Sequence, residues 1–132
     1  MQCDVDPSNP NRDMAVIFHF QDPTHFYYVH FSASSDGFHN IIGLVDGKDR
    51  VKINHEEPGE SVFRLKNRKY HDFKVTYSAL TGEIKAYMDD MNTPILTAKD
   101  TTLGHGRIGI GSFDDTGSFD DIILWGKTRK EK

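Results

Sequence analysis

The chain has 132 residues and a mass of 15.0 kDa, which is the size of one domain, and its 36% hydrophobic and 11% aromatic residues indicate a core built from few, large side chains. Sixteen Lys and Arg residues against twenty Asp and Glu residues give a net charge of -4, which argues against a nucleic-acid partner because phosphate binding needs clustered basic side chains. The longest apolar runs are too short for a transmembrane helix or a signal-peptide core, and one cysteine excludes an intrachain disulfide.

Residues 1–13 predict an N-terminal arm or edge segment. They contain two prolines, two asparagines and three aspartates. Any strand over Gln2 to Val5 is expected to be short and at a sheet edge, because Pro7 and Pro10 cannot donate a hydrogen bond to a ladder.

Residues 14–126 predict an all-β domain, followed by a basic, solvated tail over 127–132. Turn signals rich in Gly, Asp and Pro recur every ten to fourteen residues, and the stretches between them are rich in β-branched and aromatic residues. Without helices to serve as crossovers, the strands should pair antiparallel in a two-sheet sandwich. The expected strands are 14–20, 25–32, 38–45, 49–54, 60–65, 70–77, 83–89, 94–98, 107–113 and 118–125.

Alternation assigns faces to the first two strands of this domain. Side chains on a strand point to opposite faces in turn, so one set from each strand is expected in the core and the other on the opposite face. The core set is Val16, Phe18, Phe20, Tyr27, Val29 and Phe31. The opposite set is Ala15, Ile17, His19, Phe26, Tyr28 and His30.

The opposite set mixes aromatic rings with imidazoles, which favours a partly wet, concave sheet face that receives a ligand. The alternative of a second packed layer, or of a surface with scattered aromatics, stays open. Aromatic faces could stack on a pyranose ring while His, Asn and Arg side chains bond hydroxyls or a carboxylate. The candidate ligand-binding residues are His19, Phe26, Tyr28, His30, His39, Asn40 and Arg50.

The motifs for dinucleotides, metal ions and glycoside hydrolysis give weaker indications of function. Gly104, Gly106 and Gly109 match the dinucleotide fingerprint G-x-G-x-x-G, but they open a strand rather than a helix and more plausibly permit a close backbone approach. Asp114 and Asp120 flank a Gly-containing turn and could hold a structural calcium ion, although loop solvation explains them as well. Zinc-ligand spacings and the carboxylate pair of a glycoside hydrolase are both missing from the sequence.

Three stretches in order resemble a known family. They read FHFQDPTHFYYVHFSASSD, YHDFKVTYSALTGEIKAYMDD and GRIGIGSFDDTGSFDDIILWG. This order looks like concanavalin A-like jelly-roll domains of the laminin G-like group, related to 3-keto-glycoside hydrolase-type domains, over about Met14 to Gly126. Tyr70 stands where that group commonly has Trp, and the E-x-D-x-E element of its glucanase branch is missing.

The resemblance implies a concave sheet that binds oligo- or polysaccharide as a non-catalytic module, in an extracellular or periplasmic protein, although no export signal can be recognised here. Two alternatives are a glycan-processing enzyme, with His30 and Asp72 as acid and base, and an interaction domain without a small ligand. Relatives usually carry additional N-terminal strands, one of which pairs with the closing strand. If such strands are absent here, residues Phe119 to Leu124 would form an exposed edge unless Cys3 to Asp6, a partner chain or a second copy in a homodimer covers it.

Overall fold

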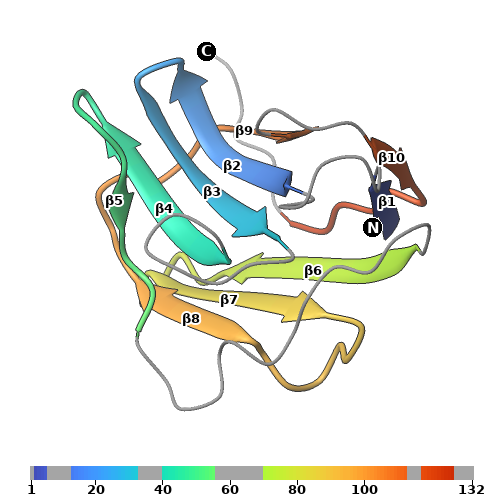
Figure 1. The fold of residues 1–132 in the computed structure, drawn as a ribbon. Coiled ribbons are helices and arrows are strands. Elements are labelled where there is room, and N and C mark those ends of the chain that lie inside the picture. Colours follow the sequence, from blue (N-terminus) through green and yellow to red (C-terminus); the bar gives the residue numbers. More distant parts are fainter. Residues whose placement is uncertain (1, 6–12, 33–39, 56–69, 113–116, 127–132) are drawn as a thin grey trace.

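The structure, a computed structural model, describes residues 2–5, 13–32, 40–55, 70–112 and 117–126 (Figure 1). These residues form ten strands and no helix, and therefore no helix that could cross a membrane. The strands are β1 (Gln2–Val5), β2 (Met14–Asp22), β3 (His25–Phe31), β4 (Ile41–Asp46), β5 (Val51–Lys52), β6 (His71–Tyr77), β7 (Glu83–Met88), β8 (Leu96–Lys99), β9 (Arg107–Gly111) and β10 (Gly117–Asp120).

The strands build two five-stranded sheets that pack as a β-sandwich. Sheet I has the order β10-β1-β6-β7-β8, and sheet II has the order β5-β4-β3-β2-β9. All pairs of neighbouring strands are antiparallel. The predicted all-β class with antiparallel pairing is confirmed.

The strand predictions differ from the structure at the two ends of the chain. β1 lies between β10 and β6, not at an edge, because Gln2 pairs with both Asp120 and Asp72. β10 ends at Asp120, where the pairing with β1 also ends, so the expected strand over 118–125 is shorter than predicted. The strand expected over 60–65 lies outside the described residues.

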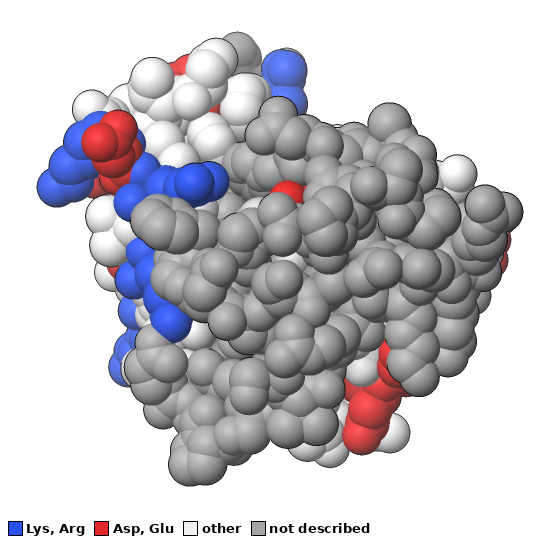
Figure 2. All heavy atoms as spheres, viewed as in Figure 1, with Lys and Arg blue, Asp and Glu red and all other residues white. Residues whose placement is uncertain are grey.

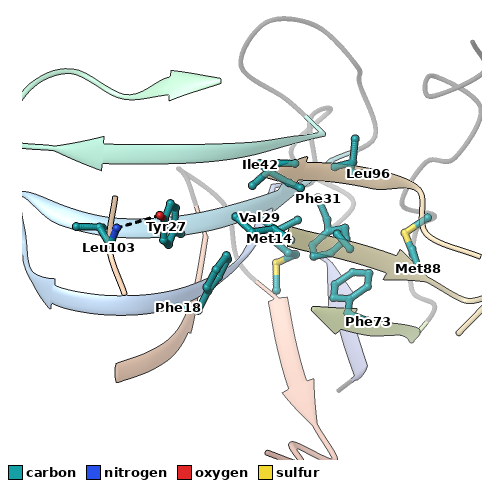
Figure 3. Packing of buried hydrophobic residues seen from close by; sticks show 13 residues of the cluster. Met14, Phe18, Tyr27, Val29, Phe31, Ile42, Phe73, Met88, Leu96 and Leu103 are labelled. Carbon is teal, nitrogen blue, oxygen red and sulfur yellow. Dashed lines mark hydrogen bonds between the residues drawn. The ribbon is translucent and has the colours of Figure 1, made fainter. Parts of the chain in front are cut away.

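The core lies between the sheets and follows the predicted alternation over β3. Tyr27, Val29 and Phe31 are fully buried, as expected. The rings of Phe31 in sheet II and Phe73 in sheet I stack with centroids 4.0 Å apart and planes 6° apart (Figure 3). This stacking joins the two layers near the centre of the apolar cluster.

The alternation predicted for β2 is wrong at its far end because of a β-bulge. Register with β3 shifts between Phe18 and Asp22, and His19 has a φ of 49°. The extra residue turns His19 toward the interior, where its ring lies 4.3 Å from that of Tyr77, and turns Phe20 to the opposite face. A β-carbon on Gly106 would collide with the His19 backbone, so this glycine allows the close backbone approach that the sequence indicated.

Candidate functional site

Three aromatic rings follow one another on the outer face of sheet II, the face turned away from sheet I. The Phe20 and Phe26 rings have centroids 5.8 Å apart, and those of Phe26 and Tyr28 are 6.1 Å apart. Phe20 and Phe26 are half-buried, whereas Tyr28 is 2% exposed. The rings available to a ligand are therefore the pair on β2 and β3, and we call Phe20 and Phe26 the aromatic pair.

Tyr28 forms part of the floor beside this pair rather than a free stacking surface. It pairs with Gly43 on β4, and a β-carbon at Gly43 would collide with the Tyr28 ring, so the ring lies flat across the glycine. Burial raises the pKa of the Tyr28 phenol, and the charge of Arg50 and its hydrogen bond to the phenol oppose that rise. Arg50 itself is exposed in the turn between β4 and β5.

His30 follows Tyr28 on the same face and is also buried, with 2% of its surface exposed. Its Nε2 lies 2.9 Å from Oδ1 of Asp13, and both side chains are almost completely buried. A buried carboxylate and imidazole stabilise each other only as a pair, because either charge alone would lose its hydration. The expectation that Tyr28 and His30 lie on a wet face is therefore wrong, because both side chains are closed to solvent.

The remaining predicted ligand-binding residues do not join the aromatic pair. His19 lies on the interior side, with Nδ1 2.7 Å from the carbonyl oxygen of Leu103. Asn40 is buried, and its Oδ1 accepts a hydrogen bond of 2.7 Å from the Ser32 backbone amide, which is a structural role. His39 lies outside the described residues. His19 and His30 therefore do not meet, because they face opposite sides of sheet II.

Polar side chains occupy the end of sheet II beyond the aromatic pair. In the β2–β3 turn, Nδ1 of His25 lies 2.9 Å from Oδ1 of Asp22, and its Nε2 lies 3.7 Å from Asp46 at the end of β4. Hydrogen bonds from His25 and Thr24 lower the pKa of Asp22 to about 2. Asp22 therefore stays ionised at neutral pH and offers an acceptor beside the exposed end of the sheet.

Basic residues lie near the same end of the sheet. Figure 2 shows Lys and Arg side chains gathered on the side where Figure 1 places β5 and the β4–β5 turn. That turn contains Lys48 and Arg50, which are both exposed. This end of sheet II, the rim of the face, thus carries hydrogen-bond donors as well as acceptors.

The acid and base suggested for an enzyme are not brought together. His30 lies on β3 in sheet II, whereas Asp72 is exposed on β6 in sheet I. The carboxylate that meets His30 is Asp13, and the pair is closed to solvent. Proton transfer to a substrate needs hydrogen-bond reach, which this buried pair lacks.

The predicted calcium ligands are described only in part. Asp114 lies outside the described residues. Asp120 is exposed at the end of β10, where its Oδ1 accepts a hydrogen bond of 2.8 Å from the Asp121 amide. Within the ranges that the structure describes, no group of three or more His, Cys, Asp or Glu side chains could hold a metal ion.

Sequence reasoning missed two residues of this face, Phe20 and Asp13. Phe20 was placed in the core because a bulge at a histidine has no clear sequence signal. Asp13 could have been found, because it lies two residues before Ala15, the direct partner of His30. Diagonal neighbours of this kind are within side-chain reach across an antiparallel pair.

Comparisons of the chain with protein-family models, with curated proteins and with solved structures gave no match.

Proposed function

We propose that this chain is a non-catalytic carbohydrate-binding module whose ligand lies across the outer face of sheet II. The observation that carries the proposal is the aromatic pair: two half-buried phenyl rings, 5.8 Å apart, on neighbouring strands of one sheet. Such rings offer flat apolar surface to the C–H face of a pyranose, and their strands hold them at a fixed spacing.

The surroundings of the pair supply the rest of a sugar site. Arg50 and Lys48 on the β4–β5 turn are donors for hydroxyls or for a sugar carboxylate, and Asp22 is an ionised acceptor. The packed floor of Tyr28, His30 and Asp13 supports the rings and binds no sugar itself. The sequence resemblance to laminin G-like jelly-roll domains, including their topology and their location outside the cytoplasm, is part of this proposal.

A site of this size binds weakly. Each ring contact contributes on the order of 1 kcal/mol beyond the area that it buries. With one aromatic pair we expect dissociation constants in roughly the micromolar to millimolar range. Oligosaccharides that reach both rings and the basic rim should bind more tightly than monosaccharides.

Affinity electrophoresis through gels that contain neutral or acidic polysaccharides tests the proposal. We expect retardation of the wild-type chain by at least one polysaccharide, and its loss in Phe26→Ala and Phe20→Ala, with thermal unfolding to confirm that each variant is folded. Leu80→Ala, in the turn between β6 and β7, is the matched control because Leu80 is exposed and distant along the chain. No retardation by any polysaccharide, or unchanged retardation of both Phe variants, would contradict the proposal.

A further inference from the structure

The two sides of the sandwich are built differently. On the side of β5 and β8, Asn54 forms an isolated antiparallel bridge with Ala98, and the His55 amide donates a hydrogen bond of 2.8 Å to the carbonyl oxygen of Thr97. These backbone contacts run from sheet II to sheet I and close the space between them. The opposite side is formed by the edge strands β9 and β10.

The interior face of β9 is uncovered. Ile110 pairs directly with Val16, so both side chains point to the same face, and Val16 packs against the core. Ile108, two residues earlier, shares that face. Both side chains should therefore be buried between the sheets, yet Ile108 is 50% and Ile110 41% exposed.

The chain that follows β10 is apolar and exposed as well. Ile122, Ile123 and Leu124 are each more than half exposed, and Trp125 is 79% exposed. Four consecutive large apolar residues in solvent are unusual for a monomer, whose exposed hydrophobic residues are normally scattered. We call Ile108, Ile110 and residues 122–125 the open side.

β9 also presents a free strand edge. Across the part of the chain that the structure describes, β9 pairs with β2 alone. Its sequence, Arg-Ile-Gly-Ile-Gly, has no Lys, Glu or Pro, the residues with which natural sheets discourage edge-to-edge pairing. Apart from Arg107, the side chains of β9 are uncharged, so an antiparallel strand could add to this edge.

We propose that the open side is the interface of a homodimer, in which β9 of one copy pairs antiparallel with β9 of the second copy and the two 122–125 segments are buried alongside. A two-fold axis through the middle of β9 brings the same surface of both copies together, which is the requirement for a closed interface. An apolar strip is complementary to itself, and its Trp is among the residue types that dominate binding energy at interfaces.

The exposed area is large enough for a stable dimer. With roughly 150–200 Å² for each fully exposed large side chain, the exposures of 41% to 79% of these six residues amount to roughly 500–700 Å² per copy. Two copies would then bury on the order of 1,000–1,400 Å², which reaches the range of specific protein–protein interfaces.

Sedimentation velocity and Trp fluorescence of the 132-residue chain over about 1–200 µM test the proposal. We expect twice the 15.0 kDa mass at the upper concentrations. Trp125 is the only tryptophan, so its emission should shift to the blue over the same concentration range as it leaves water. A monomer at all concentrations would overturn the proposal and leave the open side to a different polypeptide, and a dimer without the emission shift would place the interface elsewhere.

Variants locate the interface. Ile110→Lys should raise the dimer dissociation constant at least tenfold. Trp125→Ser should have the same effect. Because Trp125 is mostly exposed, its replacement leaves the core intact, so this variant tests the interface even if Ile110→Lys unfolds. Leu80→Lys is the control, because Leu80 is 97% exposed away from β9 and β10, and it should stay dimeric. Dimers of unchanged affinity in Trp125→Ser, and in a folded Ile110→Lys, would contradict the proposed interface.

Discussion

At the residue scale, the hydroxyl of Tyr27 ties the core to the loop between β8 and β9. The fully buried Tyr27 donates a hydrogen bond of 2.6 Å to Oδ1 of Asp100. It accepts one of 3.0 Å from the Leu103 amide, which Figure 3 shows as a dashed line. Burial, together with the hydrogen bond to Asp100, raises the pKa of Tyr27 well above its ordinary value of 10.0. The neutral phenol is thus the form that the fold stabilises.

Replacing Tyr27 by Phe should lower the free energy of unfolding by about 1–3 kcal/mol, because the buried Leu103 amide would lose its acceptor. Urea denaturation followed by fluorescence measures this change. Tyr77→Phe is the matched control, since the described residues offer the Tyr77 hydroxyl no hydrogen bond, and it should change stability much less. Equal stability of Tyr27→Phe and the wild type would show that water replaces the lost contact.

The same residue predicts a pH dependence. Below pH 10.0 both folded and unfolded chains keep the Tyr27 proton, so its contribution to stability is complete. Above pH 10.0 the unfolded chain loses this proton while the folded chain keeps it, and stability falls as the pH rises toward the folded pKa. Denaturation curves between pH 8 and 11 should show that the free energy of unfolding declines less steeply with pH in Tyr27→Phe than in the wild type. Part of the decline that is left in Tyr27→Phe is due to Tyr28, because burial also raises the pKa of its phenol. Identical slopes in both proteins would contradict this role.

At the scale of elements, sheet II depends on a glycine opposite an aromatic ring. Gly43 on β4 faces Tyr28 on β3, and the ring occupies the space of the missing β-carbon. Because the ring fills this space, the Tyr28 phenol is buried, while the Phe20 and Phe26 rings stay partly exposed. Strand alternation alone predicts an exposed Tyr28.

Gly43→Ala should therefore destabilise the domain by about 1–3 kcal/mol, because the added methyl group forces the Tyr28 ring to move. Gly104→Ala, in the loop between β8 and β9, is the control, since a β-carbon there meets nothing within 4 Å. An alanine that fits without strain is neutral or stabilises by up to about 1 kcal/mol through the unfolded state. The thermal unfolding temperatures of the two variants should thus move in different directions, and a Gly43→Ala variant as stable as Gly104→Ala would mean that Tyr28 repacks freely.

At the scale of the whole molecule, the two sheets are held together by large side chains that meet between them. Phe31 and Phe73 stack almost parallel across the interface of the layers, and each is buried. With few small apolar residues in the composition, such ring contacts carry much of the packing between layers. The core is thus sensitive to the loss of a single ring.

Phe73→Ala should cost about 3–5 kcal/mol, the usual loss for a buried ring. A double-mutant cycle with Phe31→Leu and Phe73→Leu should show a coupling of about 0.5–1.5 kcal/mol between the two rings. Urea denaturation of the wild type, both single variants and the double variant measures it. Additive losses would show that each ring packs against the cluster independently of the other.

The sequence by itself determined the fold class and much of the core. Alternating apolar residues and regularly spaced turns can only be satisfied by antiparallel strands, and over β3 the alternation correctly placed Tyr27, Val29 and Phe31 inside. Both signals are local, and local periodicity is readable without knowing which strands are neighbours. The sequence also predicted that the apolar residues of the last segment, Phe119 to Leu124, would be exposed unless another segment or chain covers them.

Only the tertiary structure decided what lies on the outer face of sheet II. The bulge at His19 exchanged the faces of His19 and Phe20, and Gly43 together with Asp13 turned Tyr28 and His30 into a dry floor. These outcomes depend on register and on residues far apart in the chain, so a pattern within one strand cannot contain them. For the same reason the pairing of β1 between β10 and β6, and the exposure of Ile108 and Ile110 on an interior face, became visible only once the sheets were assembled.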